Sequence, residues 1–158
     1  MMVYYLDASA LVKYYVPERG SPWVTNLLNA RGPGGAWAQM AVTTLLSNVE
    51  GVCAIERAVR MGRLDTASRD IARRRLLLDL RRRFRILGVD SDLVLRASQL
   101  AEVYPLRAYD AIHLATALHL NVWLAQERLP ACVLVSADED LLVAGQAEGL
   151  VVENPNDH

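Results

Sequence analysis

The feature that most restricts the fold of this chain is the alternation of short apolar runs with longer segments of helical pattern. The run VYYL, residues 3–6, ends at Asp7, and the helical pattern ASALVKYYV follows at once. A short continuous apolar run of this kind is typical of a strand that is buried on both faces of a parallel sheet. Parallel strands need crossover connections, which are usually helices. The sequence therefore predicts an α/β sandwich, in which helices flank a mostly parallel central sheet.

The rest of the chain continues this alternation. Further strands are expected over residues 36–43, 85–89 and 132–137 and in the stretch after Gly149. Helices are expected between the last two strands and over residues 8–16, 21–30, 45–62, 65–84, 91–104 and 106–118. Thr43 or Thr44 can cap helix 45–62, and Asp65 can cap the helix after it.

Length and composition predict a single domain over residues 1–158. A hydrophobic content of 53% is enough for one core without disulfides. Cys53 and Cys132 belong to no disulfide or zinc spacing and are expected to be small core residues. The first apolar run has no basic leader, and no later run approaches the length of a membrane span. We therefore expect a cytoplasmic protein with no membrane partner.

The positive charge is unevenly distributed. The formal net charge of −1 argues against a surface that attracts nucleic acid everywhere. Sixteen of the seventeen basic residues are arginines, and eight of these sixteen fall between Arg69 and Arg85. This Arg-rich segment is either a patch that binds RNA phosphates or a solvated helix face, and the sequence leaves both interpretations open.

Two carboxylates lie in apolar surroundings on predicted helices. Asp110 stands near the start of LRAYDAIHLATAL, where it can favour the positive end of the helix dipole, pair with Arg107, or face a cation in a cleft. Glu50 has no basic residue three or four positions away, unlike Glu56, which is followed by Arg60. Glu50 therefore needs a partner from elsewhere in the fold.

Other acids directly follow predicted strands, where the functional crevice of an open α/β sheet lies. Asp7 follows the first strand and can also act as the N-cap of the next helix. Asp138 and Asp140 follow strand 132–137, and Ser136 with Glu139 fits a capping box there. Each local explanation is sufficient for a single residue.

A shared site explains these acids together, because carboxylates that converge on one cleft repel one another unless a cation holds them. Oxygen ligands suit hard ions such as Mg²⁺ or Mn²⁺. Such an ion lowers the pKa of a bound water and stabilises the charge that develops on a phosphate leaving group. The acids thus point to phosphoryl chemistry.

The same stretches resemble a known family. YYLDASALVKYYVPE, LLSNVEGVCAIERAVRMGRL, LRAYDAIHLATAL and VSADEDLLVAGQAEGLVVENP are similar, in order and spacing, to the motifs of PIN-domain ribonucleases, and among them to the VapC-type toxins of toxin-antitoxin pairs. The likeness spans nearly the whole chain and implies a PIN-like three-layer α/β sandwich. One departure is Pro105, where the family commonly has glycine in a loop.

The resemblance also implies roles for individual residues. Asp7, Glu50, Asp110 and Asp138 would bind the metal and carry catalysis, Ser9 would support the site by hydrogen bonding, and Asp140 is a further supporting candidate. His113 is expected to be a hydrogen-bonded core histidine rather than a general base.

The expected function is that of a Mg²⁺- or Mn²⁺-dependent endoribonuclease, the toxin half of a toxin-antitoxin pair. The resemblance implies an RNA substrate, 5′-phosphate and 3′-hydroxyl products, an antitoxin partner and a homodimer. A phosphatase with a strand-end Asp nucleophile is disfavoured because Ser9 stands where a second acid would be expected. The chief rival is a non-catalytic scaffold of the same fold that binds RNA or a partner.

Overall fold

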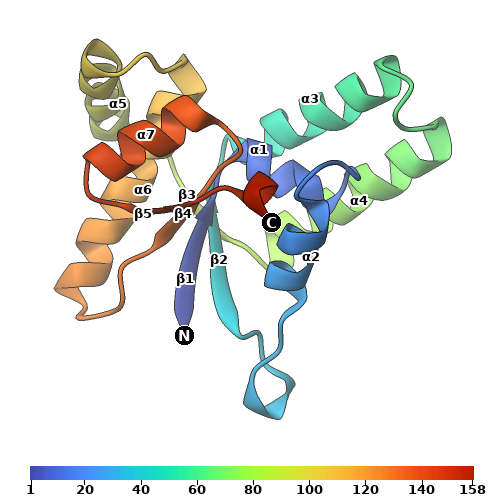
Figure 1. The fold of residues 1–158 in the computed structure, drawn as a ribbon, viewed down its shortest axis with the longest axis horizontal. Coiled ribbons are helices and arrows are strands. Elements are labelled where there is room, and N and C mark those ends of the chain that lie inside the picture. The colour runs from blue at the N-terminus through green and yellow to red at the C-terminus, as the bar shows by residue number, and fades with distance from the viewer.

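The computed structural model describes residues 1–158 and contains one five-stranded sheet (Figure 1). The strands are β1 (Met2–Leu6), β2 (Gln39–Thr44), β3 (Arg85–Leu87), β4 (Val133–Val135) and β5 (Val151–Glu153). Their order is β3-β2-β1-β4-β5, and every neighbouring pair is parallel. Strand β1 is therefore central, with Tyr4 in register with Ala41 of β2 and with Val133 of β4.

Helices cover both faces of this sheet, which confirms the three-layer α/β sandwich (Figure 1). The first group is α1 (Ala8–Leu11), α2 (Ser21–Asn29), α3 (Ser47–Arg60) and α4 (Thr66–Arg82). The second group is α5 (Ser91–Val103), α6 (Ala108–Gln126) and α7 (Glu139–Ala147). Short 3-10 turns cover Val12–Tyr14, Pro33–Gly35 and Pro155–Asp157. No helix combines the length and the apolar character needed to cross a membrane.

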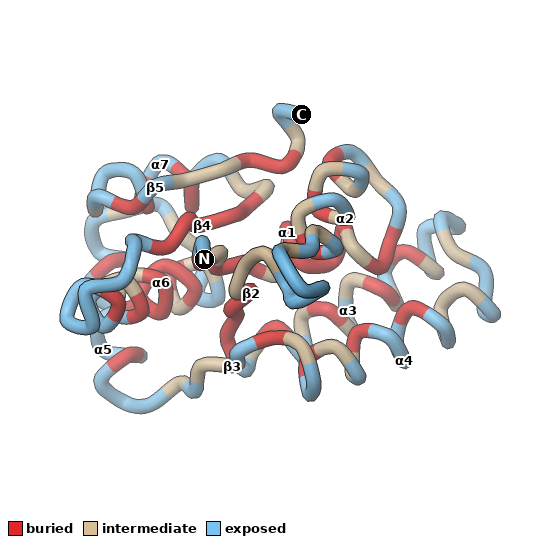
Figure 2. Tube along the Cα trace, turned by 90° about the horizontal axis from the view of Figure 1, so that it is seen from below, coloured by how far each residue is buried: buried red, intermediate tan, exposed pale blue.

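Two hydrophobic clusters, one on each face of the sheet, form the core. Tyr5 belongs to the cluster beneath α5, α6 and α7, and its neighbour Leu6 belongs to the cluster beneath α1 to α4. This alternation follows from the two-residue period of a strand, which sends successive side chains to opposite faces. Both side chains are fully buried, as expected for the central strand of a covered parallel sheet. Figure 2 shows the buried residues along the strands and the inner sides of the helices.

Two helices differ in extent from the sequence prediction, and one predicted cap is confirmed. The expected helix 8–16 is α-helical only to Leu11 and then tightens into a 3-10 turn before Pro17, which disfavours α conformation in the residue preceding it. Helix α6 runs on to Gln126, well beyond the expected end at residue 118. Asp65 caps α4 as predicted, through a 2.7 Å hydrogen bond from the Ser68 amide.

The predicted threonine caps of the helix after β2 are wrong. Helix α3 starts at Ser47, and its N-cap residue, Leu46, has no side-chain hydrogen bond. The Thr43 hydroxyl instead donates to the Leu6 carbonyl at 2.7 Å and lies 2.6 Å from the Ser47 hydroxyl. Thr43 therefore ties β2 to β1 rather than capping α3.

The buried face of α6 should dominate stability on its side of the sheet. We expect Leu114→Ala, which removes a fully buried side chain, to lower the free energy of unfolding by about 2–5 kcal/mol through lost burial and a residual cavity. Urea denaturation measures this change. Val122→Ala on the exposed side of the same helix is the control and should change little. Equal losses in the two variants would contradict the assignment of faces.

Candidate functional site

One cleft at the carboxyl ends of β1 and β4 contains all four predicted acids. It has a volume of about 710 Å³, and Asp7, Glu50, Asp110 and Asp138 are among the residues that line it. Asp7 and Asp138 come together because β1 and β4 are parallel neighbours whose carboxyl ends share one edge of the sheet. Glu50 and Asp110 enter from the first turns of α3 and α6.

Asp7 is both a helix cap and a member of the cleft. Its Oδ1 accepts the Ala10 amide at 2.8 Å, which makes Asp7 the N-cap of α1. The Ser9 hydroxyl lies 2.8 Å from each carboxylate oxygen of Asp7. Asp7 is only 2% exposed, and burial raises the pKa of its carboxyl, while its hydrogen bonds from Ala10, Ser136 and Ser9 oppose the rise. The two sequence interpretations of Asp7 are therefore compatible.

Ser136 is a site residue that the sequence analysis assigned to another role. Its hydroxyl donates to Asp7 Oδ2 at 2.7 Å and accepts the Asp138 amide at 3.0 Å. The predicted capping box is wrong, because Asp138 itself caps α7 by accepting the Leu141 amide at 3.1 Å. The Ser9 hydroxyl accepts the Ala137 amide at 2.8 Å, so the two serines join the loop after β1 to the loop after β4.

The partner that Glu50 lacks locally is His113 of α6. His113 Nε2 lies 2.8 Å from Glu50 Oε2, and Nδ1 lies 3.0 Å from the Tyr5 hydroxyl. A carboxylate can only accept, so Nε2 carries the proton, and in the neutral ring Nδ1 is then the acceptor for the Tyr5 hydroxyl. The expectation of a hydrogen-bonded core histidine is confirmed, and this histidine also orients Glu50.

Asp110 is the acid of the cleft whose pKa is raised by burial and by neighbouring carboxylates. Burial raises the pKa of its carboxyl, and the charges of Asp138 and Asp7 raise it further. Arg107 opposes this rise weakly and forms no salt bridge with Asp110. The local pairing of Asp110 with Arg107 is thus not present, although Asp110 does lie in the first turn of α6.

The cleft also contains residues that sequence reasoning did not select. Arg57, Arg63 and Arg107 line it, so basic side chains accompany the acidic group. Arg63 is held by Glu18, which lies 3.2 Å from its Nη1. Cys53 was expected in the core but is exposed and lines the cleft. Asp140 is exposed on α7 and does not line the cleft, so the structure does not bring it together with the other acids.

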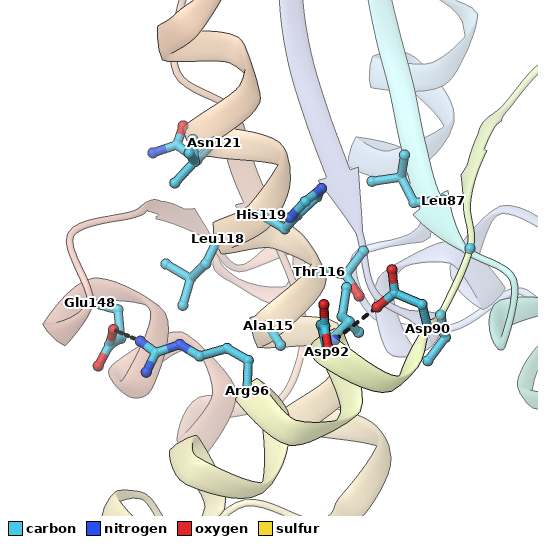
Figure 3. Close-up of a pocket in the computed structure, with 14 residues that line it drawn as sticks. Leu87, Asp90, Asp92, Arg96, Ala115, Thr116, Leu118, His119, Asn121 and Glu148 are labelled. Carbon is cyan, nitrogen blue, oxygen red and sulfur yellow. Dashed lines mark hydrogen bonds and ion pairs between the residues drawn. The ribbon is translucent and has the colours of Figure 1, made fainter.

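A hollow larger than the acidic cleft lies elsewhere, beside α5 and α6 (Figure 3). It measures about 950 Å³ and contains none of the four acids. Three of its charged groups already have partners: Arg96 lies 3.1 Å from Glu148, and Asp90 accepts the Leu93 amide at 2.9 Å. Size alone therefore does not identify the functional site, and the smaller acidic cleft is the candidate.

The cleft supplies the donor chemistry of a hard cation without a complete cage. No group of three or more His, Cys, Asp or Glu side chains is close enough to surround a metal ion. The hydrogen bonds of Glu50 and Asp138 occupy one oxygen of each carboxylate, which leaves the other oxygen open. Because Mg²⁺ usually binds one or two carboxylates and keeps several waters, these oxygens fit such an ion.

Comparison with known proteins gives one family and a consistent set of folds. The PIN domain family model matches residues 4–145. A toxin-antitoxin complex from Klebsiella pneumoniae has a TM-score of 0.56 and 20% identity, covering 96% of this chain and 97% of that one. VapC20 of Mycobacterium tuberculosis, described as a sarcin-ricin loop cleaving toxin, has a TM-score of 0.61 and 15% identity, covering 94% and 96%. A search of curated protein sequences found no match.

The raised pKa of Asp110 should make the free energy of unfolding depend on pH. The raised pKa of Asp110 means that its ionised form is disfavoured in the folded state, so the penalty grows as pH rises from the unfolded to the folded pKa and persists above both. We therefore expect Asp110→Asn, in EDTA at pH 7, to unfold at equal or higher urea concentration than the wild type. The difference should vanish at a pH below the ordinary Asp range, about 3.9. A marked loss of stability at pH 7 would instead indicate a favourable local role for the Asp110 charge.

Proposed function

We infer that this chain, which belongs to the PIN-domain family, is a cytoplasmic endoribonuclease that hydrolyses RNA phosphodiester bonds with Mg²⁺ or Mn²⁺. The observation that carries this proposal is the convergence of Asp7, Glu50, Asp110 and Asp138, which come from separate elements, on one cleft. A structural role alone does not explain why Asp110, whose pKa is raised by burial and by the charges of Asp138 and Asp7, is placed beside these acids.

The residues of the cleft would have three different roles: binding the ion, orienting the acids and binding RNA phosphates. Asp7, Glu50, Asp110 and Asp138 would hold the ion, with Ser9 and Ser136 fixing the Asp7 carboxylate. When bound, the ion would lower the pKa of a water and neutralise charge on the phosphate. His113 forms a hydrogen bond with one oxygen of Glu50, which leaves the other oxygen available to bind the ion. Arg57, Arg63 and Arg107 would bind the RNA phosphates, because a guanidinium matches phosphate oxygens in pairs.

We further propose that the protein is the toxin of a toxin-antitoxin pair and forms a homodimer. The similar folds support the toxin role, since one of them belongs to a toxin-antitoxin complex and another to a sarcin-ricin loop cleaving toxin. An antitoxin could silence the cleft by inserting an arginine or lysine, since the carboxylates that suit a metal ion also pair with a guanidinium or ammonium. Inhibition would then displace the metal and block RNA together.

One observation favours the rival function, a non-catalytic scaffold that binds RNA or a partner. The acids share the cleft but do not form a compact cluster of three or more ligands. Against this rival, all four acids line the cleft, and at least one oxygen of Glu50 and of Asp138 is open. Cleavage assays decide between the two functions.

We expect the protein to cleave single-stranded RNA with Mg²⁺ or Mn²⁺ and to lose this activity in EDTA. Asp7→Asn should reduce the cleavage rate by about 100-fold or more, because even indirect partners of a metal contribute 10- to 100-fold. Asparagine retains N-cap ability, so circular dichroism should show an intact fold. Asp140→Asn, which removes an exposed acid outside the cleft, is the matched control and should keep nearly full activity. Metal-independent cleavage, or equal activity in all three proteins, would reject the proposal.

A further inference from the structure

The Arg-rich segment is not one uniform face. Arg69, at its start, is within 4.0 Å of Glu56 and 3.0 Å of Asp70, as in an ordinary solvated helix. At its end, Arg83 packs on aromatic rings instead of a carboxylate. Apart from Arg69, no arginine of the segment forms a salt bridge. Four of these unpaired arginines, Arg81, Arg82, Arg83 and Arg85, lie together where α4 leads into β3.

Aromatic stacking holds the arginine side chains in place there. The guanidinium of Arg83 lies 4.0 Å from the centre of the Trp37 ring, and that of Arg31 lies 3.3 Å from it. Arg83 Nη1 also donates to the Tyr14 hydroxyl at 2.9 Å, and that hydroxyl donates to Asn29 at 2.7 Å. These contacts restrict the Arg83 fork before any ligand arrives, which reduces the entropy lost on binding.

Two buried donors without partners share a hollow beside this stack, which we name the Trp37 hollow. It measures about 170 Å³, and its lining residues are Met1, Leu28, Trp37, Gln39, Met40, Ala41, Arg83 and Arg85. Arg83 Nη2 and Gln39 Nε2 are both buried and lack a hydrogen-bond partner. No acidic residue lines the hollow. Because a buried donor without an acceptor is costly, especially a charged one, an acceptor that reaches these two donors would be stabilised in the hollow.

We propose that the Trp37 hollow binds a backbone phosphate of the RNA, as a second contact remote from the acidic cleft. A phosphate group has several oxygens, which can accept hydrogen bonds from the Arg83 guanidinium and the Gln39 side-chain amide, with Arg85 beside them. The guanidinium groups of Arg31 and Arg83 lie 3.3 and 4.0 Å from the centre of the Trp37 ring and cover its faces, so the ring orients charged donors for a phosphate rather than receiving a base.

The position of the hollow explains how it would serve the enzyme. Gln39 and Arg85 are the first residues of β2 and β3, whereas Asp7 and Asp138 follow the last residues of β1 and β4. The hollow and the acidic cleft therefore lie at opposite ends of the parallel strands. The hollow is the one near the projecting turn between α2 and β2 (Figure 1). An RNA that reaches both is held at two points, which selects longer substrates. The identity of the polymer, but not the anion site itself, rests on the proposed function.

The test measures binding without cleavage. A fluorescein-labelled single-stranded RNA is titrated with full-length protein in EDTA, and anisotropy gives the affinity over a range of salt concentrations. Arg83→Met should weaken binding roughly tenfold by removing a charge-assisted contact, and should reduce the slope of log affinity against log salt by about 0.7. Gln39→Leu removes a neutral donor, so it should weaken binding several-fold with the slope unchanged.

Controls separate this site from general attraction between charges. Arg60→Met removes an exposed arginine of α3 outside the hollow and should leave the affinity within about twofold. In a Trp23→Phe, Trp123→Phe background, the fluorescence of Trp37 should change when RNA is added. Equal losses in Arg60→Met and Arg83→Met, or no effect of Gln39→Leu, would overturn the proposal and leave the hollow to water.

Competition identifies the source of the anion. Inorganic phosphate should compete only weakly, because a single anion makes one contact where the polymer makes several. Polyglutamate of equal charge should compete poorly, because a carboxylate presents fewer oxygens than a phosphate to the donors of the hollow. Displacement of the RNA by polyglutamate at equal charge concentration would assign the hollow to an acidic peptide and overturn the proposal. Binding that depends on Arg83 and Gln39 in a protein that cleaves no RNA would leave this site standing while the proposed nuclease function fails.

Discussion

The repulsion between carboxylates at one edge of the sheet is the constraint on which the organisation of the site depends. Asp7 can be kept there, nearly fully buried, because Ser9, Ser136 and the Ala10 amide all donate to it. Without these donors its carboxylate would be costly to bury beside Asp110 and Asp138. The same hydrogen bonds tie together the loops after β1 and β4, so the stability of the central strands and the geometry of the acids are linked.

Glu50 shows a second way of placing an acid in such a site. Its partner, His113, is fully enclosed and is itself held by Tyr5 of the central strand. A chain of hydrogen bonds therefore runs from the middle of β1 through α6 to the cleft. Because Tyr5 donates to one ring nitrogen, the other nitrogen is left to donate to Glu50. The core thus sets the orientation of a side chain that lies at the surface of the cleft.

The sequence could predict the layers and the acids because both depend on local pattern. Apolar runs such as residues 3–6 indicate buried parallel strands, and an acid directly after such a strand falls at the shared edge of the sheet. The partners of those acids could not be predicted in this way. Ser136 and Asp7 are 129 residues apart, and His113 and Glu50 are 63 apart, so their contacts depend on which strands and helices become neighbours. Once the order β1-β4 is known, Ser136 is recognisable as the residue beside Asp7.

Anomalous diffraction from crystals soaked in Mn²⁺ would show whether these acids form one cation site, as we propose. We expect one or two anomalous peaks in the acidic cleft, within direct or water-mediated reach of Asp7, Glu50, Asp110 and Asp138, and their loss in crystals of Asp110→Asn soaked in the same way. Peaks confined to other parts of the surface, or a cleft that stays without manganese at concentrations at which the enzyme is assayed, would contradict it.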